Sequence, residues 1–105
     1  MTQQLTMALE WEQRRTIEDR FWQFHASNPE IYAELVRLCR EARAAGRRKI
    51  GIRMLWERLR WTLYIERGSD EYKLNDHMTS RYARLIQQQE PELDGIFETR
   101  ELRAV

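Results

Sequence analysis

The sequence predicts a mainly α-helical domain of four helices, and two observations support this fold class. Apolar residues recur at helical spacing in four stretches, and the proline and glycine residues fall between those stretches. A chain of 105 residues has room for one hydrophobic core, so we expect a single domain over 1–105. Within that domain we expect an N-terminal helix in 1–27 and a helical core in 28–103.

The first two helices are expected on either side of Asn28. The first covers roughly 6–26, where apolar residues follow a helical spacing. Asn28 is a typical N-cap residue, and Pro29 suits the first position of the second helix. Gly46 suits the end of that second helix. The apolar face of the second helix is formed by Ile31, Leu35, Leu38, Ala42 and Ala45.

The third helix is expected over about 52–64 and is apolar on two opposite sides. At about 100° per residue, one apolar face gathers Ile52, Leu55, Trp56, Leu59 and Leu63. The opposite face gathers Met54, Trp61 and Ile65 beside Arg58. A helix of this kind either lies at the centre of the fold or presents one of its sides to a partner.

The fourth helix is expected over 76–89, with Asn75 or Asp76 as its cap and Pro91 beyond its end. Its inward face is formed by Met78, Tyr82, Leu85 and Ile86. Its outward face is formed by Thr79, Ser80, Ala83, Arg84 and Gln87, flanked by His77, Arg81 and Gln88. This outward face is polar and has no acidic residue after the cap.

The order of these elements favours a compact, winged-helix-like arrangement. The third and fourth helices form a helix-turn-helix-like pair, and the second helix of such a pair commonly enters the DNA major groove. Short strands are expected at most near 48–51, 72–74 and 96–100. The first and last of these flank the helix pair, as the strands of a winged domain do.

The charges are spread unevenly although they almost cancel. The chain has 18 Lys and Arg against 17 Asp and Glu, which gives a net charge of +1. Residues 37–67 hold a net charge of +7, and the segments before and after them hold −3 each. Such asymmetry is typical of nucleic-acid-binding surfaces. The alternative is that these arginines pair with the acidic flanks on solvated helix faces.

These observations favour a non-enzymatic DNA-binding protein whose helix 76–89 reads the major groove of duplex DNA. Ser, Thr, Gln and Arg side chains bond base edges and phosphates, and small side chains allow close approach. The candidate base-reading residues are Ser80, Arg84 and Gln87, with His77, Arg81 and Gln88 beside them. The candidate phosphate contacts are Arg47, Arg48, Lys49 and Arg53.

A protein-interaction module is the alternative function. Its apolar patch is formed by Met54, Trp61 and Ile65, with Arg58 among the steering cations. Such a patch would bind or inhibit a host protein. It would alternatively serve self-association, since symmetric DNA-reading proteins are usually homodimers. Trp56 and Trp61 among arginines also fit the stacking of a single strand, although Trp56 is expected in the core.

Signatures of catalysis are weak, so no enzyme activity, cofactor or metal site is predicted. The run Glu71-Tyr72-Lys73 matches part of a nuclease motif, but the metal-binding aspartate on a preceding strand is missing. His25 and His77 lack ligands at metal spacing, and the single cysteine, Cys39, is expected as a buried thiol. No apolar run is long enough to span a membrane and the N-terminus lacks a signal-peptide pattern, so we expect a cytoplasmic protein.

Four motifs recur together along the chain, FHASNPEIY at 24–32, YKLND at 72–76, SRYARL at 80–85 and FETR at 97–100. In these motifs the chain resembles a group of small bacteriophage and prophage proteins to which no function is assigned. The resemblance implies a mobile-element setting inside a bacterial host cell, where DNA binding and the binding of a host protein are both common. It implies no catalytic residues.

Overall fold

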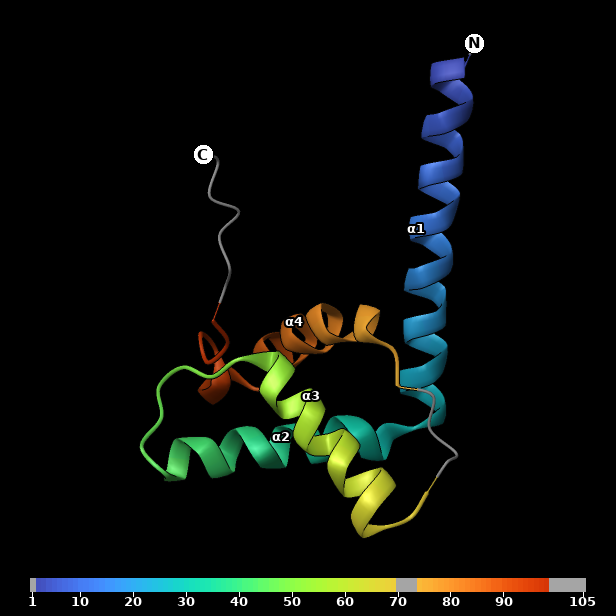
Figure 1. Ribbon diagram of the computed structural model, residues 1–105. Helices are drawn as coiled ribbons and strands as arrows, with labels where there is room; N and C mark the ends of the chain where they lie inside the picture. Colours follow the sequence, from blue (N-terminus) through green and yellow to red (C-terminus); the bar gives the residue numbers. More distant parts are fainter. Residues whose placement is uncertain (1, 70–73, 99–105) are drawn as a thin grey trace.

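The structure is a computed structural model that describes residues 2–69 and 74–98, with side chains from residue 4 onward. Its four α-helices are α1 (Thr2–Ser27), α2 (Pro29–Ala44), α3 (Ile52–Trp61) and α4 (Thr79–Gln89) (Figure 1). A π-helical turn, η1 (Thr62–Glu66), extends α3, and two 3-10 turns, η2 (Asp76–Met78) and η3 (Pro91–Leu93), flank α4. The mainly α-helical fold class is therefore confirmed.

The buried residues form one hydrophobic cluster to which all four helices contribute. The predicted main face of α3 is confirmed, since Leu55, Trp56, Leu59 and Leu63 are buried and Ile52 packs against them. The ring centroids of Trp56 and Tyr82 lie 5.9 Å apart, and those of Phe21 and Tyr82 lie 4.8 Å apart. Aromatic contacts thus join α1, α3 and α4 at the centre of the core.

Helix α1 packs on the rest of the molecule only through its C-terminal part. Phe21 is buried, whereas the side chains of residues 4–16 are all exposed. Figure 1 shows the N-terminal half of α1 projecting away from the other helices, which gives the molecule extents of 54 × 37 × 25 Å. The helix is also longer than the predicted 6–26.

The turn between α1 and α2 is built by Asn28 and Pro29. Pro29 occupies the first turn of α2, as predicted. Asn28 holds the N-cap position, but its side chain makes no cap hydrogen bond to α2. Its Nδ2 instead donates to the carbonyl oxygen of Phe24 at 3.0 Å, so this side chain closes the end of α1.

The predicted strands are mostly absent from the described residues. Ile50 and Phe97 form one isolated parallel bridge, in which the Ile50 N–H donates to Ile96 O at 2.8 Å and the Glu98 N–H donates to Ile50 O at 3.0 Å. The strands expected near 48–51 and 96–100 are therefore reduced to a single bridge within the described part of the chain. Most of the 72–74 stretch lies outside that part.

The connection between the third and fourth helices is longer than a helix-turn-helix pair needs. Such pairs join through a turn of about three or four residues, whereas here residues 67–75 separate η1 from η2. The predicted cap is confirmed, because Asn75 Oδ1 accepts a hydrogen bond from the His77 N–H at 3.0 Å. Helix α4 begins directly after this capped turn and ends before Pro91, as predicted.

The buried face of α4 is wider than the sequence pattern predicts. Tyr82, Leu85 and Ile86 are buried, as expected. Ala83 was predicted on the outward face but is also buried, at 9% exposure. The reason is that α4 packs against both α2 and α3, so two neighbours cover more of its surface than one would.

The buried hydroxyl of Tyr82 leads to a stability prediction. Among the described residues this hydroxyl has no hydrogen-bond partner, and burial raises the pKa of Tyr82 above its ordinary value. Tyr82→Phe is therefore expected to leave the free energy of unfolding unchanged or to raise it by up to about 1 kcal/mol in urea unfolding. Tyr32→Phe is the control, since the Tyr32 hydroxyl donates to Glu90 Oε2 at 2.8 Å. A larger loss from Tyr82→Phe than from Tyr32→Phe would contradict this prediction.

Candidate nucleic-acid interface

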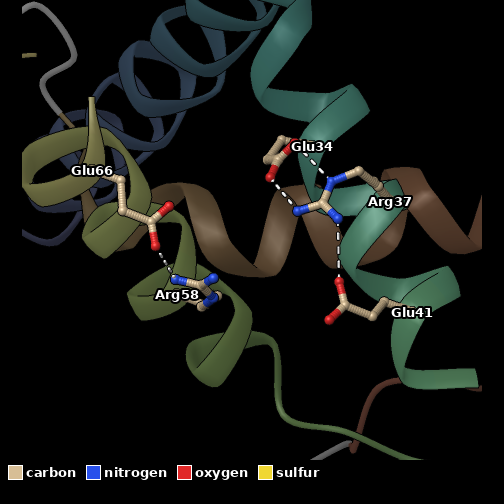
Figure 2. A network of polar contacts seen from close by, with 5 residues as sticks. All are labelled: Glu34, Arg37, Glu41, Arg58 and Glu66. Atoms are coloured by element: carbon tan, nitrogen blue, oxygen red, sulfur yellow. Dashed lines mark hydrogen bonds and ion pairs between the residues drawn. The ribbon is translucent and has the colours of Figure 1, made fainter. Parts of the chain in front are cut away.

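Many arginines of the basic segment 37–67 are neutralised by carboxylates within the fold. Arg37 contacts Glu34 at 2.7 Å and Glu41 at 3.2 Å, and Arg58 contacts Glu66 at 3.2 Å. Figure 2 shows both groups, one along α2 and one between α3 and η1. Arg58 is predicted to steer a protein partner, and in the structure its guanidinium is paired with Glu66 at the surface.

Three further arginines pair with acidic residues from distant parts of the sequence. Arg40 contacts Glu90 at 2.9 Å and Glu92 at 2.7 Å, which ties α2 to the end of α4. Arg60 and Arg53 reach Asp76 at 3.3 and 3.9 Å. The pairing of arginines with the acidic flanks, which the sequence left open, thus holds for four of the ten cations in 37–67, whereas Arg58 pairs with Glu66 inside that segment.

The pKa values of the partner carboxyl groups agree with this pairing. Hydrogen bonds from Arg37 lower the pKa of Glu34, and those from Arg40 lower the pKa of Glu92. Exposed pairs of this kind contribute little to stability. Their consequence here is electrostatic, because the neighbouring carboxylates offset the attraction of these arginines for an external anion.

Four cations lie close together at the end of α2 and in the loop that follows it, a segment (residues 43–49) that we call the basic loop. They are Arg43, Arg47, Arg48 and Lys49. All four side chains are exposed, and none has a carboxylate partner among the described residues. Gly46, with φ of +87°, lets the chain leave α2 at this point. Figure 1 places the loop on the opposite side of the molecule from α1.

The predicted DNA-reading residues of the fourth helix divide into an exposed group and an engaged group. The exposed group is the α4 stripe, formed by His77, Ser80, Arg84 and Gln88. The last three are four residues apart and so follow one side of the helix. No carboxylate partner of Arg84 lies within the described ranges.

Gln87 and Arg81 belong to the engaged group. Gln87 Nε2 donates to Ala83 O at 3.1 Å, and Gln87 Oε1 accepts from the Gly95 N–H at 3.0 Å. Arg81 Nε donates to Glu18 Oε2 at 2.7 Å, which holds α1 to α4. Both side chains therefore support the fold, and their hydrogen-bonding groups are largely used within it.

A groove between α1 and α4 was not predicted. It consists of two adjoining hollows that share Glu18, Arg81 and Arg84. One hollow is completed by Phe21, Trp22, Leu85 and Gln88, and the other by Trp11, Arg14, Arg15 and Asp19. We call this the tryptophan groove. Sequence reasoning missed it because the packing partner of α1 is not visible in the periodicity of α1 itself.

A second apolar surface, which we call the α3 patch, contains the residues that the sequence predicts for a protein-interaction module. Met54, Trp61 and Ile65 are 59%, 55% and 62% exposed, on the side of α3 and η1 away from the core. Tyr64 joins them, and it lines a shallow hollow with Trp61 and Ile65. Tyr64 was not among the residues that the sequence predicted for this patch.

The described residues show no three His, Cys, Asp or Glu side chains placed to hold a metal ion together. Cys39 is fully buried, and burial raises the pKa of its thiol to about 11, so this thiol stays protonated and unreactive near neutral pH. The run Glu71-Tyr72-Lys73 lies outside the described residues. None of the described helices combines the length and the apolar character that crossing a membrane requires.

Comparison of the chain with protein-family models, with curated proteins and with solved structures gives no match. The resemblance to small phage and prophage proteins therefore stays a prediction.

Proposed function

We propose that this protein binds duplex DNA without catalysing a reaction. The observation that carries the proposal is the charge of the basic loop, whose four cations lack carboxylate partners in the described part of the chain while the neighbouring arginines are paired. Exposed cations that the fold does not neutralise are free to replace the counterions of a phosphate backbone. Phosphate contacts of this kind position a protein on DNA without reading its sequence.

In this proposal the α4 stripe reads the bases. Arg84 has the planar, two-pronged donor group that matches guanine in the major groove, and Ser80 and Gln88 bond base edges beside it. Gln88 takes the role predicted for Gln87, whose amide is engaged with Ala83 and Gly95. Arg47, Arg48 and Lys49 keep their predicted role at the phosphates, while Arg53 is directed toward Asp76.

A winged-helix-like arrangement belongs to the same proposal. The chain runs from α2 through Ile50 to α3 and α4, and then to Phe97, which bridges back to Ile50. This order of three helices with flanking extended segments supports the assignment. The residues after 98, where part of the predicted strand 96–100 falls, lie outside the described part of the chain. Within a bacterial host cell, such a protein would act in the cytoplasm, in the prophage setting that the motifs suggest.

The division of roles is tested with two single variants and a panel of duplex sequences. Arg84→Ala is expected to cost about 1–3 kcal/mol of binding free energy on the preferred sequence and to relax the sequence choice. Lys49→Ala is expected to weaken binding to all duplex sequences by a similar factor and to reduce the salt dependence of binding. Fluorescence anisotropy titrations of labelled duplexes measure both effects. An equal loss of sequence discrimination from the two variants would contradict the assigned roles.

Protein interaction is the second candidate function, and the exposure of the α3 patch favours it. Exposed Trp, Tyr, Met and Ile side chains in one place are typical of binding surfaces. Trp61→Gln is expected to abolish self-association or partner binding, measured by analytical ultracentrifugation and by affinity capture, while DNA affinity stays intact. If Trp61→Gln lowers DNA affinity in a folded protein, the patch belongs to the DNA surface and this second function is wrong.

A further inference from the structure

Trp11 and Trp22 are the two exposed tryptophans of α1, and they lie on the same side of that helix. They are 61% and 47% exposed. At about 100° per residue, their separation along the sequence brings them to within roughly 20° of each other around the helix axis. Along the axis they lie roughly 16 Å apart, at a rise of about 1.5 Å per residue. Two indole rings therefore flank the tryptophan groove, one in each of its hollows.

The charges between the two rings leave two arginines available. Arg81 is bound to Glu18 at 2.7 Å, and hydrogen bonds from Arg81 lower the pKa of Glu18. Arg15 pairs with Glu12 at 3.9 Å. Arg14 and Arg84, in contrast, form no ion pair among the residues that the structure describes, and neither does Asp19, which also lines the groove, so the two unpaired cations outnumber the one unpaired carboxylate.

Aromatic rings with interspersed arginines are the features by which proteins hold single-stranded nucleic acid. Bases stack on indole rings whatever their sequence, since each base has a π-face, and cations along the groove contact the phosphates. A length of roughly 16 Å corresponds to about five nucleotides stacked at about 3.4 Å each. The groove is thus long enough for a short unpaired segment.

Arg84 connects this groove to the α4 stripe. It is the central residue of the exposed stripe, and it also lines both hollows of the groove. Gln88, the last residue of the stripe, lines the hollow that contains Trp22. A strand that leaves a duplex bound on α4 would therefore enter the groove without crossing another element.

We propose that the tryptophan groove binds an unpaired DNA strand, so that the preferred ligand is a duplex continuing into a single-stranded overhang. The inference rests on the proposed function, because the basic loop and the α4 stripe hold the duplex portion. Trp11 and Trp22 stack the bases of the overhang, and Arg14 contacts its phosphates.

The test compares a blunt duplex with the same duplex carrying an overhang of about ten thymidines, a length within the site sizes of single-strand binding folds. The wild-type protein is expected to bind the overhang duplex about 5- to 150-fold more tightly than the blunt one, the range that one stacked base supplies. Trp11→Ala is expected to reduce that preference, because only Trp22 then remains to stack a base, and to leave the affinity for the blunt duplex unchanged. Trp11→Phe is expected to retain part of the preference, because a smaller ring still stacks.

Trp61→Ala is the matched control, since Trp61 is 55% exposed, is also a tryptophan and lies outside the groove. It is expected to keep the full preference for the overhang. Equal wild-type affinity for the two duplexes would overturn the inference and leave duplex binding standing, as would an equal loss of preference in the Trp61 and Trp11 variants. Absence of binding to either duplex would instead overturn the proposed function together with this inference. Trp11 is exposed, so circular dichroism of the variant is expected to match the wild type.

Discussion

Replacing Arg47 and Arg48 together with alanine is expected to weaken binding to duplex DNA by about 60-fold at about 0.1 M salt. The logarithm of the affinity falls linearly with the logarithm of the salt concentration, and each lost phosphate contact reduces the slope by about 0.9. At about 0.1 M salt, each unit of slope corresponds to about a tenfold change in affinity. Anisotropy titrations over a salt series measure the affinity and the slope. The slope of the variant is expected to be less steep by about 1.8.

Arg37→Ala with Arg40→Ala is the matched control for this double variant. It removes the same formal charge from the same helix–loop region, but each of its arginines already contacts two carboxylates. We expect a much smaller change in affinity and slope, arising only from the long-range field. Equal losses from the two double variants would show that net charge, rather than the unpaired cations of the basic loop, governs binding.

Replacing Trp56 with alanine is expected to cost about 3–5 kcal/mol of unfolding free energy, the typical cost of removing a large buried aromatic side chain. Trp56 is fully buried and its ring packs against Tyr82 at a centroid distance of 5.9 Å. Domains of this size are stable by only about 5–15 kcal/mol, so the variant would lose a large part of its stability. Urea unfolding, followed by far-UV circular dichroism, is expected to show a midpoint lower by more than about 1 M.

Trp61→Ala serves as the control for the stability measurement. Its ring is mostly exposed, and exposed substitutions usually change stability by no more than about 0.5 kcal/mol. A similar drop in both variants would contradict the assignment of Trp56 to the core and of Trp61 to the surface. The pair therefore tests the two-sided character of α3 directly.

That two-sided character was predictable from the sequence, because it depends on periodicity alone. Leu55, Trp56 and Leu59 follow one side of a helix, and Met54 and Trp61 follow the other. Local chemistry also placed the helix boundaries well, since Asn75 caps the turn before α4 and Gly46 adopts the left-handed backbone after α2. Signals of this kind act within a few residues and do not require the partner to be known.

The features that depend on distant partners were not predictable in the same way. The pairing of Arg40 with Glu90 and Glu92 joins residues about fifty positions apart, and no local sequence pattern predicts it. The engagement of Gln87 with Gly95 likewise follows from how the chain returns after Pro91. The burial of Ala83 arises because α4 has two packing neighbours. Each of these changes the candidate site, since each decides which polar side chains remain available.

The most direct test of the proposed function is the salt dependence of wild-type binding to a mixed-sequence duplex, measured by fluorescence anisotropy. With four phosphate contacts from the basic loop, the affinity is expected to fall about 10²-fold between about 50 mM and about 200 mM salt. At the lower salt concentration we expect a dissociation constant in the micromolar range or below. No binding at about 50 mM salt, or binding that does not change with salt, would contradict phosphate contact by the basic loop and would make the α3 patch the better guide to function.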